Sequence, residues 1–269
     1  MNDTSTPVRI FIGSGEASLL ERKVLIQSMR KNTKRPLDIW VINGTHNAIE
    51  RNNDVPFLTP LSLSLKYRNA TEFSLYRYLI PELSNHSGRA IYMDSDMICL
   101  GDIGELFDTP MNDCDFLAVS EYGESQWATS VMLINCESSR FNLDGIFSDI
   151  DAGLYTYADF SRFDKRFLSH RRYSIGTLDP HWNEFDHHDA RTRLIHYTNL
   201  LTQPWKFPDH PFGDLWFEYF REAKAQGLVT EKDVDLSLSR AYVRQNINSG
   251  NSPYGLGGRL LRRLTRWVA

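Results

Sequence analysis

A pair of carboxylates is the part of this sequence best suited to chemistry. The two stand one residue apart in the triplet Asp94-Ser95-Asp96, and apolar runs flank the triplet on both sides. Because unpaired carboxylates between buried segments are costly, a cation is a natural partner for this turn. Mn²⁺ and Mg²⁺ take oxygen ligands and commonly bridge protein carboxylates to substrate phosphates. The alternative is a plain turn, since Asp-Ser-Asp is also ordinary turn chemistry, but the apolar flanks favour a metal site.

Two other segments carry polar groups that could hold a ligand. Residues 179–189 contain His181, His187 and His188 among several acids, and imidazole with carboxylate can ligate a divalent metal. A polar loop leading into a strand is the interpretation we favour for that segment. The turn Gly13-Ser14-Gly15 could approach a phosphate or a base, or it could be a simple turn. It matches neither the Walker pattern nor the full dinucleotide-binding fingerprint.

The elements that position these residues alternate between strand and helix along the chain. Short β-branched runs predict strands, and apolar residues at helical spacing predict helices. The expected strands are Val8–Ile12, Leu37–Ile42, Arg89–Met93, Phe116–Ser120, Val131–Ile134 and Leu194–Tyr197. The expected helices are Leu19–Met29, a segment that starts after Thr71 and ends or bends at Pro81, and Leu143–Ala152, with a loop over residues 43–56.

This alternation predicts an α/β fold with a doubly wound, mainly parallel sheet flanked by helices. In such sheets, ligands bind outside the carboxyl ends of the strands. The acidic triplet directly follows the expected strand Arg89–Met93. The sequence therefore places the candidate metal site at the carboxyl edge of the sheet.

The composition is that of a globular protein. The chain has 269 residues, which fits one large domain or two small ones, and its 41% hydrophobic content can form a sizeable core. No apolar run approaches the ~18 residues that a membrane-spanning helix needs, and residues 1–30 are not typical of a secretory signal. Three cysteines, Cys99, Cys114 and Cys136, lack metal-ligand spacing, which favours free thiols in a reducing cytoplasm.

The end of the chain differs from the rest in charge. Residues 240–269 contain six arginines and no acid, which leaves 24 basic against 34 acidic residues in the body and argues against nucleic-acid binding. We expect a main domain over residues 1–245, followed by a linker and a basic amphipathic helix within 246–269. Such a helix suits an anionic membrane surface. The alternative is a helix packed on its own domain.

Several segments resemble glycosyltransferase family 8, in the order in which that family has them. Residues 90–98, followed by 101–107, are similar to the metal-binding segment of the family. Ser74-Leu75-Tyr76-Arg77 resembles the helix that supplies an arginine near the donor. Val131-Met132-Leu133-Ile134-Asn135 resembles the strand after the donor-sugar loop, and His196-Tyr197 with Pro204-Trp205 resembles the segment that ends in Lys-Pro-Trp. The likeness covers about residues 8–207.

This resemblance implies a GT-A fold, a UDP-sugar donor, a Mn²⁺ ion (with Mg²⁺ as the alternative) and retention of anomeric configuration. The implied metal ligands are Asp94, Asp96 and His196. The implied donor and catalytic contacts are Gly13, Ser14, Ser74, Arg77, Ser95, Gln203, Lys206, Asp164 and Lys165.

The departures from the family pattern gather around the donor sugar and its phosphates. Ala128-Thr129-Ser130 stands where the family has Asn-Ala-Gly, and Asn199 stands where it has glycine. Gln203 occupies the position of a lysine that contacts the diphosphate, so Lys206 is the expected substitute. The Asp-Gln pair of the family fits Asp164-Lys165 best, with Asp159 as a competing match.

Together, these observations predict a cytoplasmic hexosyltransferase, peripheral on the inner face of a membrane, that uses a UDP-hexose and a saccharide or glycolipid acceptor. The altered positions leave one alternative from another class, a nucleotide-sugar-binding scaffold or partner subunit that has lost transfer. An inverting transferase of the same fold is a third hypothesis. It would need a carboxylate base, for which Asp164 or Asp186 would serve.

Overall fold

A mixed β-sheet forms the centre of the protein in this computed structural model, which describes residues 6–51, 57–58, 67, 70–121, 123 and 125–251. The sheet has eight strands in the order β4-β3-β2-β1-β5-β8-β7-β9. Their bounds are β1 Val8–Ser14, β2 Leu37–Asn43, β3 Ala48–Arg51, β4 Phe57–Leu58, β5 Arg89–Asp94, β7 Phe116–Glu121, β8 Gln126–Asn135 and β9 Ile175–Thr177.

A second, smaller sheet begins directly after the acidic turn. It has the order β10-β11-β6, with β6 Met97–Cys99, β10 Glu184–Phe185 and β11 Leu194–His196. Strand β6 starts three residues after β5 ends, so the turn between the two sheets is the triplet Asp94-Ser95-Asp96.

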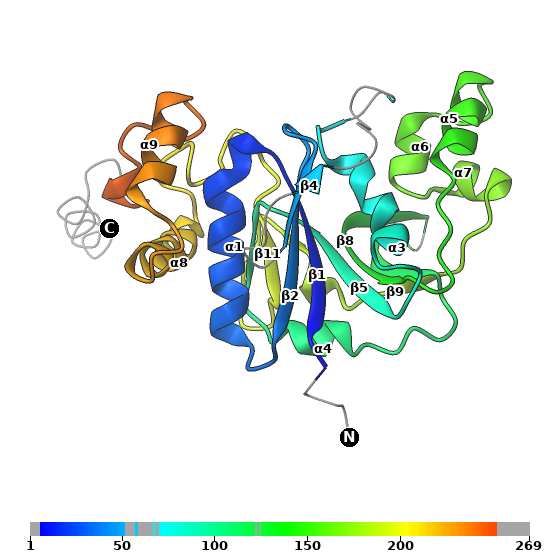
Figure 1. The fold of residues 1–269 in the computed structure, drawn as a ribbon, viewed down its shortest axis with the longest axis horizontal. Helices are drawn as coiled ribbons and strands as arrows, with labels where there is room; N and C mark the ends of the chain where they lie inside the picture. The colour runs from blue at the N-terminus through cyan, green and yellow to red at the C-terminus, as the bar shows by residue number, and fades with distance from the viewer. Residues whose placement is uncertain are drawn as a thin grey trace, which may run out of the picture.

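Helices flank the central sheet on both sides (Figure 1). Helix α1 lies between the sheet and the pair α8 and α9, while α5, α6 and α7 gather at the opposite end of the molecule. The helices are α1 Leu19–Asn32, α3 Ile80–Leu83, α4 Ile103–Phe107, α5 Leu143–Asp151, α6 Tyr157–Ser161, α7 Lys165–His170, α8 Gly213–Ala225 and α9 Glu231–Ser239. The 3₁₀ turns are η1 Glu16–Ser18, η2 Ser74–Leu79, η3 Pro180–Trp182 and η4 Ile247–Ser249.

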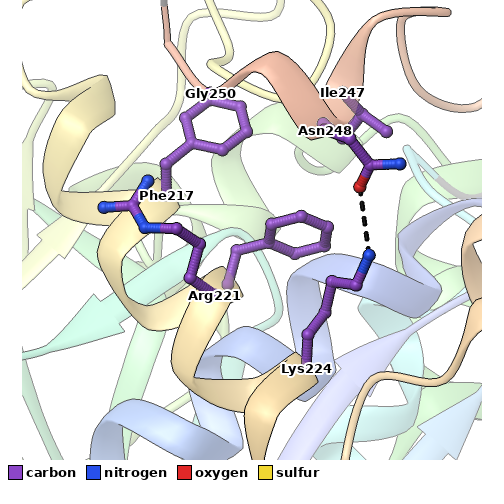
Figure 2. Close-up of a pocket in the computed structure, with 7 residues that line it drawn as sticks. Phe217, Arg221, Lys224, Ile247, Asn248 and Gly250 are labelled. Atoms are coloured by element: carbon purple, nitrogen blue, oxygen red, sulfur yellow. Dashed lines mark hydrogen bonds between the residues drawn. The ribbon is translucent and has the colours of Figure 1, made fainter. Parts of the chain in front are cut away.

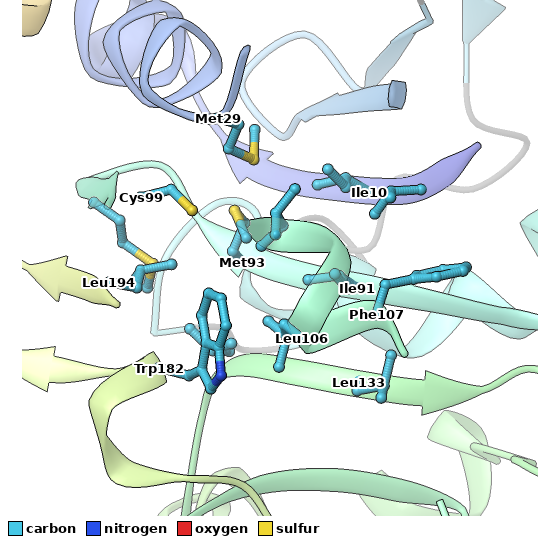
Figure 3. Close-up of a cluster of buried hydrophobic side chains, with 14 of the residues drawn as sticks. Ile10, Met29, Ile91, Met93, Cys99, Leu106, Phe107, Leu133, Trp182 and Leu194 are labelled. Carbon is cyan, nitrogen blue, oxygen red and sulfur yellow. The ribbon is translucent and has the colours of Figure 1, made fainter. Parts of the chain in front are cut away.

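Alternating side chains of the buried strands build a core on each face of the sheet. In β1, Ile10 and Ile12 point into one cluster, and Phe11 points into the other. Figure 3 shows the first cluster, in which Cys99 and Leu194 of the second sheet lie in the same core as Met93 of the central sheet. The other cluster is rich in aromatic rings from β7 and α5–α7.

The α/β class and the GT-A architecture predicted from the sequence are confirmed, with three corrections of detail. The central sheet is mixed, because β8 runs antiparallel to both β5 and β7, and the described strands of this sheet pair in parallel at β1–β2, β1–β5 and β7–β9. Pro81 lies in the first turn of α3 and does not end a helix, because its missing N–H is tolerated at a first turn. The expected loop over residues 43–56 contains β3, which pairs with β2.

The packed part of the chain extends beyond residue 245, the expected end of the main domain. Ile247 is buried against α8, and Asn251 exchanges hydrogen bonds with the backbone of His210. The expected amphipathic helix, with residues 256–268, lies outside the described residues. Within the described part, no helix has the length and apolar character needed to cross a membrane. All three cysteines are free, with Cys99 and Cys136 buried.

Candidate active site

The acidic turn is anchored at the carboxyl end of β5. Asp94 is the last residue of that strand and stands opposite Gly13 of β1. The Tyr92 hydroxyl donates to Asp94 Oδ1 at 2.5 Å, and a side chain at Gly13 would collide with that hydroxyl and with the Phe73 ring. Glycine is therefore required at position 13 for Tyr92 to reach the carboxylate. Gly13 and Ser14, predicted as part of a turn, are the last two residues of β1, and Gly13 contributes to the site in this way.

The second sheet brings His196 to the same turn. Strands β6 and β11 pair antiparallel, with Met97 opposite His196, and the Tyr197 amide donates to the Asp96 carbonyl at 2.9 Å. This pairing sets His196 Nε2 3.1 Å from Asp96 Oδ1. The His196 side chain is buried, at 5% exposure. Two residues far apart in the sequence thus share one polar contact, as the resemblance implies.

The charges of this group shift one another's titration. Burial raises the pKa of Asp94, although the Arg77 guanidinium opposes this effect. Burial alone would lower the pKa of His196, but the charge and hydrogen bond of Asp96 outweigh it and raise that pKa. Both shifts favour the protonated forms, a neutral Asp94 carboxyl and a charged His196 ring, so a cation that binds here must displace these protons.

The donor set of this group fits a divalent cation. Two carboxylates and an imidazole are ligands that Mn²⁺ or Mg²⁺ can take. Among the residues that the structure describes, no three His, Cys, Asp or Glu side chains lie close enough together to hold a metal ion as they stand. Asp94 is held by Tyr92 and Arg77, and Asp96 by His196, so a metal would replace part of these contacts.

Arg77 links the acidic turn to strand β8. Its guanidinium lies 3.3 Å from Asp94 Oδ1, stacks over the Tyr92 ring, and donates to both the carbonyl and the hydroxyl of Thr129. Its Nε donates to the Ser74 carbonyl at 2.8 Å, so Ser74 holds the arginine through its backbone. The altered residue Thr129 therefore has a role in this structure, because it supplies two acceptors to Arg77.

Gln203 occupies the place where the family has lysine, and it contacts the acidic turn. Its side-chain amide donates to the Tyr197 carbonyl at 3.0 Å and lies 3.4 Å from Asp96 Oδ2. Its oxygen is buried without a hydrogen-bond partner, which is a cost unless a ligand or water supplies a donor. Lys206 is exposed, two residues beyond Pro204, and its charge reaches the carboxyl of Glu21.

Glu21 is the residue of this region that the sequence interpretation missed. It lies in the first turn of α1, 3% exposed, and one carboxyl oxygen has no hydrogen-bond partner. Burial raises its pKa to about 8. Helical spacing could have found it, because Glu21 shares a face with Val24, Leu25 and Ser28, which are apolar or small.

The remaining predicted residues are either buried near the acidic turn or lie at helix ends. Ser14 and Ser95 are buried beside the turn. Asp164 caps α7 by accepting from the Phe167 amide, and Lys165 begins that helix in an exposed position. No contact in the described part of the chain joins either residue to the acidic turn. Asp159 belongs to the capping box of α6.

The histidines of residues 179–189 do not form a metal centre among the described residues. His181 pairs with Glu184 at 2.6 Å, and His187 lies 3.9 Å from Asp189. Asp186 instead holds the loop after β11, since its carboxylate accepts from the Thr198 hydroxyl and the Asn199 amide. This loop contains the altered position Asn199.

A separate cavity of about 280 Å³ lies between α8 and the turn η4 (Figure 2). Phe217 and Phe220 form its apolar wall, and Arg221 and Lys224 stand at its rim. Lys224 reaches across to the Asn248 side-chain oxygen at 3.2 Å. None of the predicted donor or metal residues lines it.

Comparisons with known proteins show what this chain is similar to. The sequence matches the model of glycosyl transferase family 8 over residues 42–217. Protein CDI of Arabidopsis thaliana is 27% identical over 254 residues, covering 82% of this chain and 90% of that protein.

Two solved structures illustrate the likeness of fold. The galactosyltransferase LgtC, in complex with donor and acceptor sugar analogues, superimposes with a TM-score of 0.60 at 14% identity, covering 85% of this chain and 100% of that one. The bifunctional glycosyltransferase WbbM, in its apo form, superimposes with a TM-score of 0.54 at 13% identity over 86% of this chain. This chain spans about half the length of WbbM, with 51% covered.

Proposed function

The chain belongs to glycosyltransferase family 8 and is a glycosyltransferase, and from this we propose that it transfers a hexose from a UDP-sugar to a saccharide or glycolipid acceptor with retention. The observation that carries this proposal is the contact between His196 Nε2 and Asp96 Oδ1 at the carboxyl edge of the sheet. Ligands bind at this edge in open α/β sheets.

In this proposal Asp94, Asp96 and His196 hold a Mn²⁺ ion. When bound, such an ion neutralises the diphosphate and stabilises the departing nucleotide. The acidic turn requires a cation before a diphosphate approaches, because two carboxylates and a diphosphate repel one another at short range. Tyr92 and Arg77 hold Asp94 in place until then.

The surrounding cations and amides complete the donor site. Arg77 brings a positive charge to the turn. Its hydrogen bonds to the Ser74 carbonyl and to the Thr129 hydroxyl hold the guanidinium in place. Gln203 supplies a hydrogen bond without charge, so we assign the diphosphate contact to the exposed ammonium of Lys206. Ser14 and Ser95, both buried, are assigned to the nucleotide in this proposal. Asp164 and Lys165 are proposed on the donor-sugar side.

Retention is proposed through attack by the acceptor hydroxyl on the face of the sugar that the diphosphate leaves. The bond from the anomeric carbon to the diphosphate oxygen breaks, the bond to the acceptor oxygen forms, and the acceptor proton passes to the departing diphosphate. We also propose that the arginine-rich segment after residue 245 brings the enzyme to an anionic membrane surface, where a glycolipid acceptor would be presented.

Binding of Mn²⁺ and UDP to alanine variants tests the metal site. Asp94→Ala, Asp96→Ala and His196→Ala should each abolish Mn²⁺-dependent binding of UDP in calorimetry while the unfolding temperature stays near that of the wild type. Asp113→Ala, a carboxylate outside the site, is the matched control. Wild-type affinity in His196→Ala would show that the histidine is not a ligand.

A screen of UDP-hexoses with Mn²⁺ for released UDP tests the activity. Turnover of one UDP-hexose supports the transferase. Tight UDP binding without turnover, with any UDP-sugar and saccharide acceptor, would instead favour the nucleotide-sugar-binding scaffold.

A further inference from the structure

His196 has two ring nitrogens, and the structure gives each a different neighbour. Nε2 faces Asp96 Oδ1, whereas Nδ1 lies 3.1 Å from the side-chain oxygen of Asn183. An imidazole that binds a metal through one nitrogen must carry its proton on the other. That N–H commonly donates to an oxygen that fixes the ring orientation. Asn183 is placed to provide this oxygen.

The backbone holds Asn183 firmly at that place. Asn183 follows the turn η3, where its amide donates to the Pro180 carbonyl, and its neighbour Trp182 is part of the core. Strand β10 begins at the next residue and pairs with β11, so the chain on both sides of Asn183 is fixed relative to His196. The Asn183 side chain itself is buried, with the residue 5% exposed.

The other end of the Asn183 amide is held by Ser130. The amide nitrogen donates to Ser130 Oγ at 3.0 Å. With its nitrogen engaged there, Asn183 presents its oxygen to His196, and an oxygen can only accept the Nδ1 proton. Ser130, in β8, stands where the resemblance to the family places a glycine, which has no hydroxyl to offer. This contact is therefore a feature of this chain.

We propose that Ser130 and Asn183 are positioning residues, which together keep the proton of His196 on Nδ1 and direct Nε2 toward the acidic turn. This inference rests on the proposed metal site. The two residues act through His196 and do not touch the substrate. The neighbouring residue Thr129 accepts a hydrogen bond from Arg77. Strand β8 therefore holds two groups near the acidic turn, Arg77 through Thr129 and Asn183 through Ser130.

Affinity for Mn²⁺ in the presence of UDP, measured by calorimetry, provides the main test. Asn183→Leu, which keeps the branched shape of the side chain but removes both hydrogen bonds, should weaken Mn²⁺ binding by about 10- to 100-fold. Ser130→Ala, which removes only the far hydrogen bond, should weaken it by about two- to tenfold. Asn183→Asp keeps an acceptor oxygen and should bind Mn²⁺ more tightly than Asn183→Leu. Ser139→Ala, a buried serine with a backbone hydrogen bond away from the site, is the matched control and should keep wild-type affinity.

The protonation of the ring gives a second readout that a merely structural role would not move. In ¹⁵N spectra of the histidine rings with Mg²⁺ and UDP, the wild type should show the proton of His196 on Nδ1, with His196→Ala identifying the signal. At the same limiting concentration of Mg²⁺, Ser130→Ala should show a larger share of His196 rings outside this metal-bound form with the proton on Nδ1. This readout remains available if Asn183→Leu fails to fold.

The outcomes separate this inference from the proposed function. If His196→Ala loses Mn²⁺ while Ser130→Ala and Asn183→Asp behave as Ser139→Ala does, with an unchanged tautomer, the positioning role is wrong and the metal site stands. If His196→Ala itself keeps wild-type affinity for Mn²⁺, the metal site is wrong, and the positioning role falls with it.

Discussion

Replacing the buried carboxyl of Glu21 by an amide should make the protein more stable at neutral and alkaline pH. Glu21 lies in the first turn of α1 beneath the acidic turn, and one of its oxygens has no partner. Burial is the main cause that raises its pKa to about 8, with Asp96 adding to the effect and Lys206 opposing it. In Glu21→Gln the side chain keeps its shape and cannot ionise.

The size of the effect follows from the difference in pKa between the folded and unfolded chain. Below the ordinary carboxyl pKa of 4.5, Glu21 is protonated in both the folded and the unfolded chain, so its ionisation does not change the free energy of unfolding. As the pH rises from there to about 8, the unfolded chain releases the proton while the folded chain keeps it. The free energy of unfolding then falls by about 1.4 kcal/mol per pH unit, which amounts to about 3 kcal/mol at pH 7.

Urea unfolding of the wild type and Glu21→Gln between pH 5 and pH 8.5 measures this dependence. Near pH 5 the variant should be equal to the wild type or about 1 kcal/mol less stable, because the amide brings an extra donor into a buried place. At pH 8 it should be more stable by at least about 2 kcal/mol. Glu218→Gln, an exposed glutamate in α8, is the control. A difference between Glu21→Gln and wild type that does not change with pH would refute the reasoning.

Three further predictions concern the phosphate contact, the terminal segment and the core. Lys206→Ala should lower the release of UDP from the donor by about tenfold or more, since one charged contact is worth about 1.5–3 kcal/mol, and Gln203→Lys in that background should recover part of it. Removal of residues 256–269 should weaken sedimentation with anionic vesicles, as added salt should, and leave donor hydrolysis nearly unchanged. Phe167→Ala should cost about 3–4 kcal/mol in urea unfolding, because Phe167 is fully buried among aromatic rings.

Each of these three predictions has its own contrary result. Turnover at the wild-type rate in Lys206→Ala would mean that the metal or Lys165, and not Lys206, stabilises the leaving diphosphate. Equal vesicle binding by the truncated and full chains would remove the terminal segment from the membrane contact. Ser169→Ala, on the exposed side of the same helix as Phe167, should change stability by less than about 1 kcal/mol, and a similar loss in both variants would contradict the packing argument.

The parts of the fold that local pattern determines could be predicted from the sequence. Strand β1 and helix α1 follow from a β-branched run and an amphipathic stretch, and β5 follows from the apolar residues before Asp94. The direction of β8 could not be predicted this way. A strand buried on both faces has the same composition whether its neighbours run parallel or antiparallel, so pairing depends on connections that are far apart in the sequence.

Pro81 illustrates a second limit of the sequence. Proline is excluded from a helix interior but suits its first turn, so the same residue can end one segment or begin the next. The pattern of apolar residues from Phe73 to Ile80 does not decide between them. In the structure these residues form a 3₁₀ turn that leads into α3, and this turn places Arg77 over the Tyr92 ring.

The candidate site could be located from the sequence but not described in full. The acidic triplet and the resemblance at His196 indicated residues that the structure does bring together. The contacts of Thr129, Ser130 and Asn183 could not be foreseen, because a hydroxyl or an amide finds its partner through the tertiary fold. The proposed metal ligands and donor contacts stay predictions until they are measured.

The pairing of β6 with β11 affects how the site forms during folding. Only three residue pairs join these strands, and the chain between Asp96 and His196 forms a loop of about 100 residues, whose closure costs about 4 kcal/mol in chain entropy. Contacts of such sequence separation form late in folding, and a ladder this short is among the first to open in the native state. A cation held by both ends would act as a cross-link over that loop. Exchange of the backbone amide protons of β6 and β11 should therefore slow when Mg²⁺ and UDP bind, while exchange in β1 stays as it was.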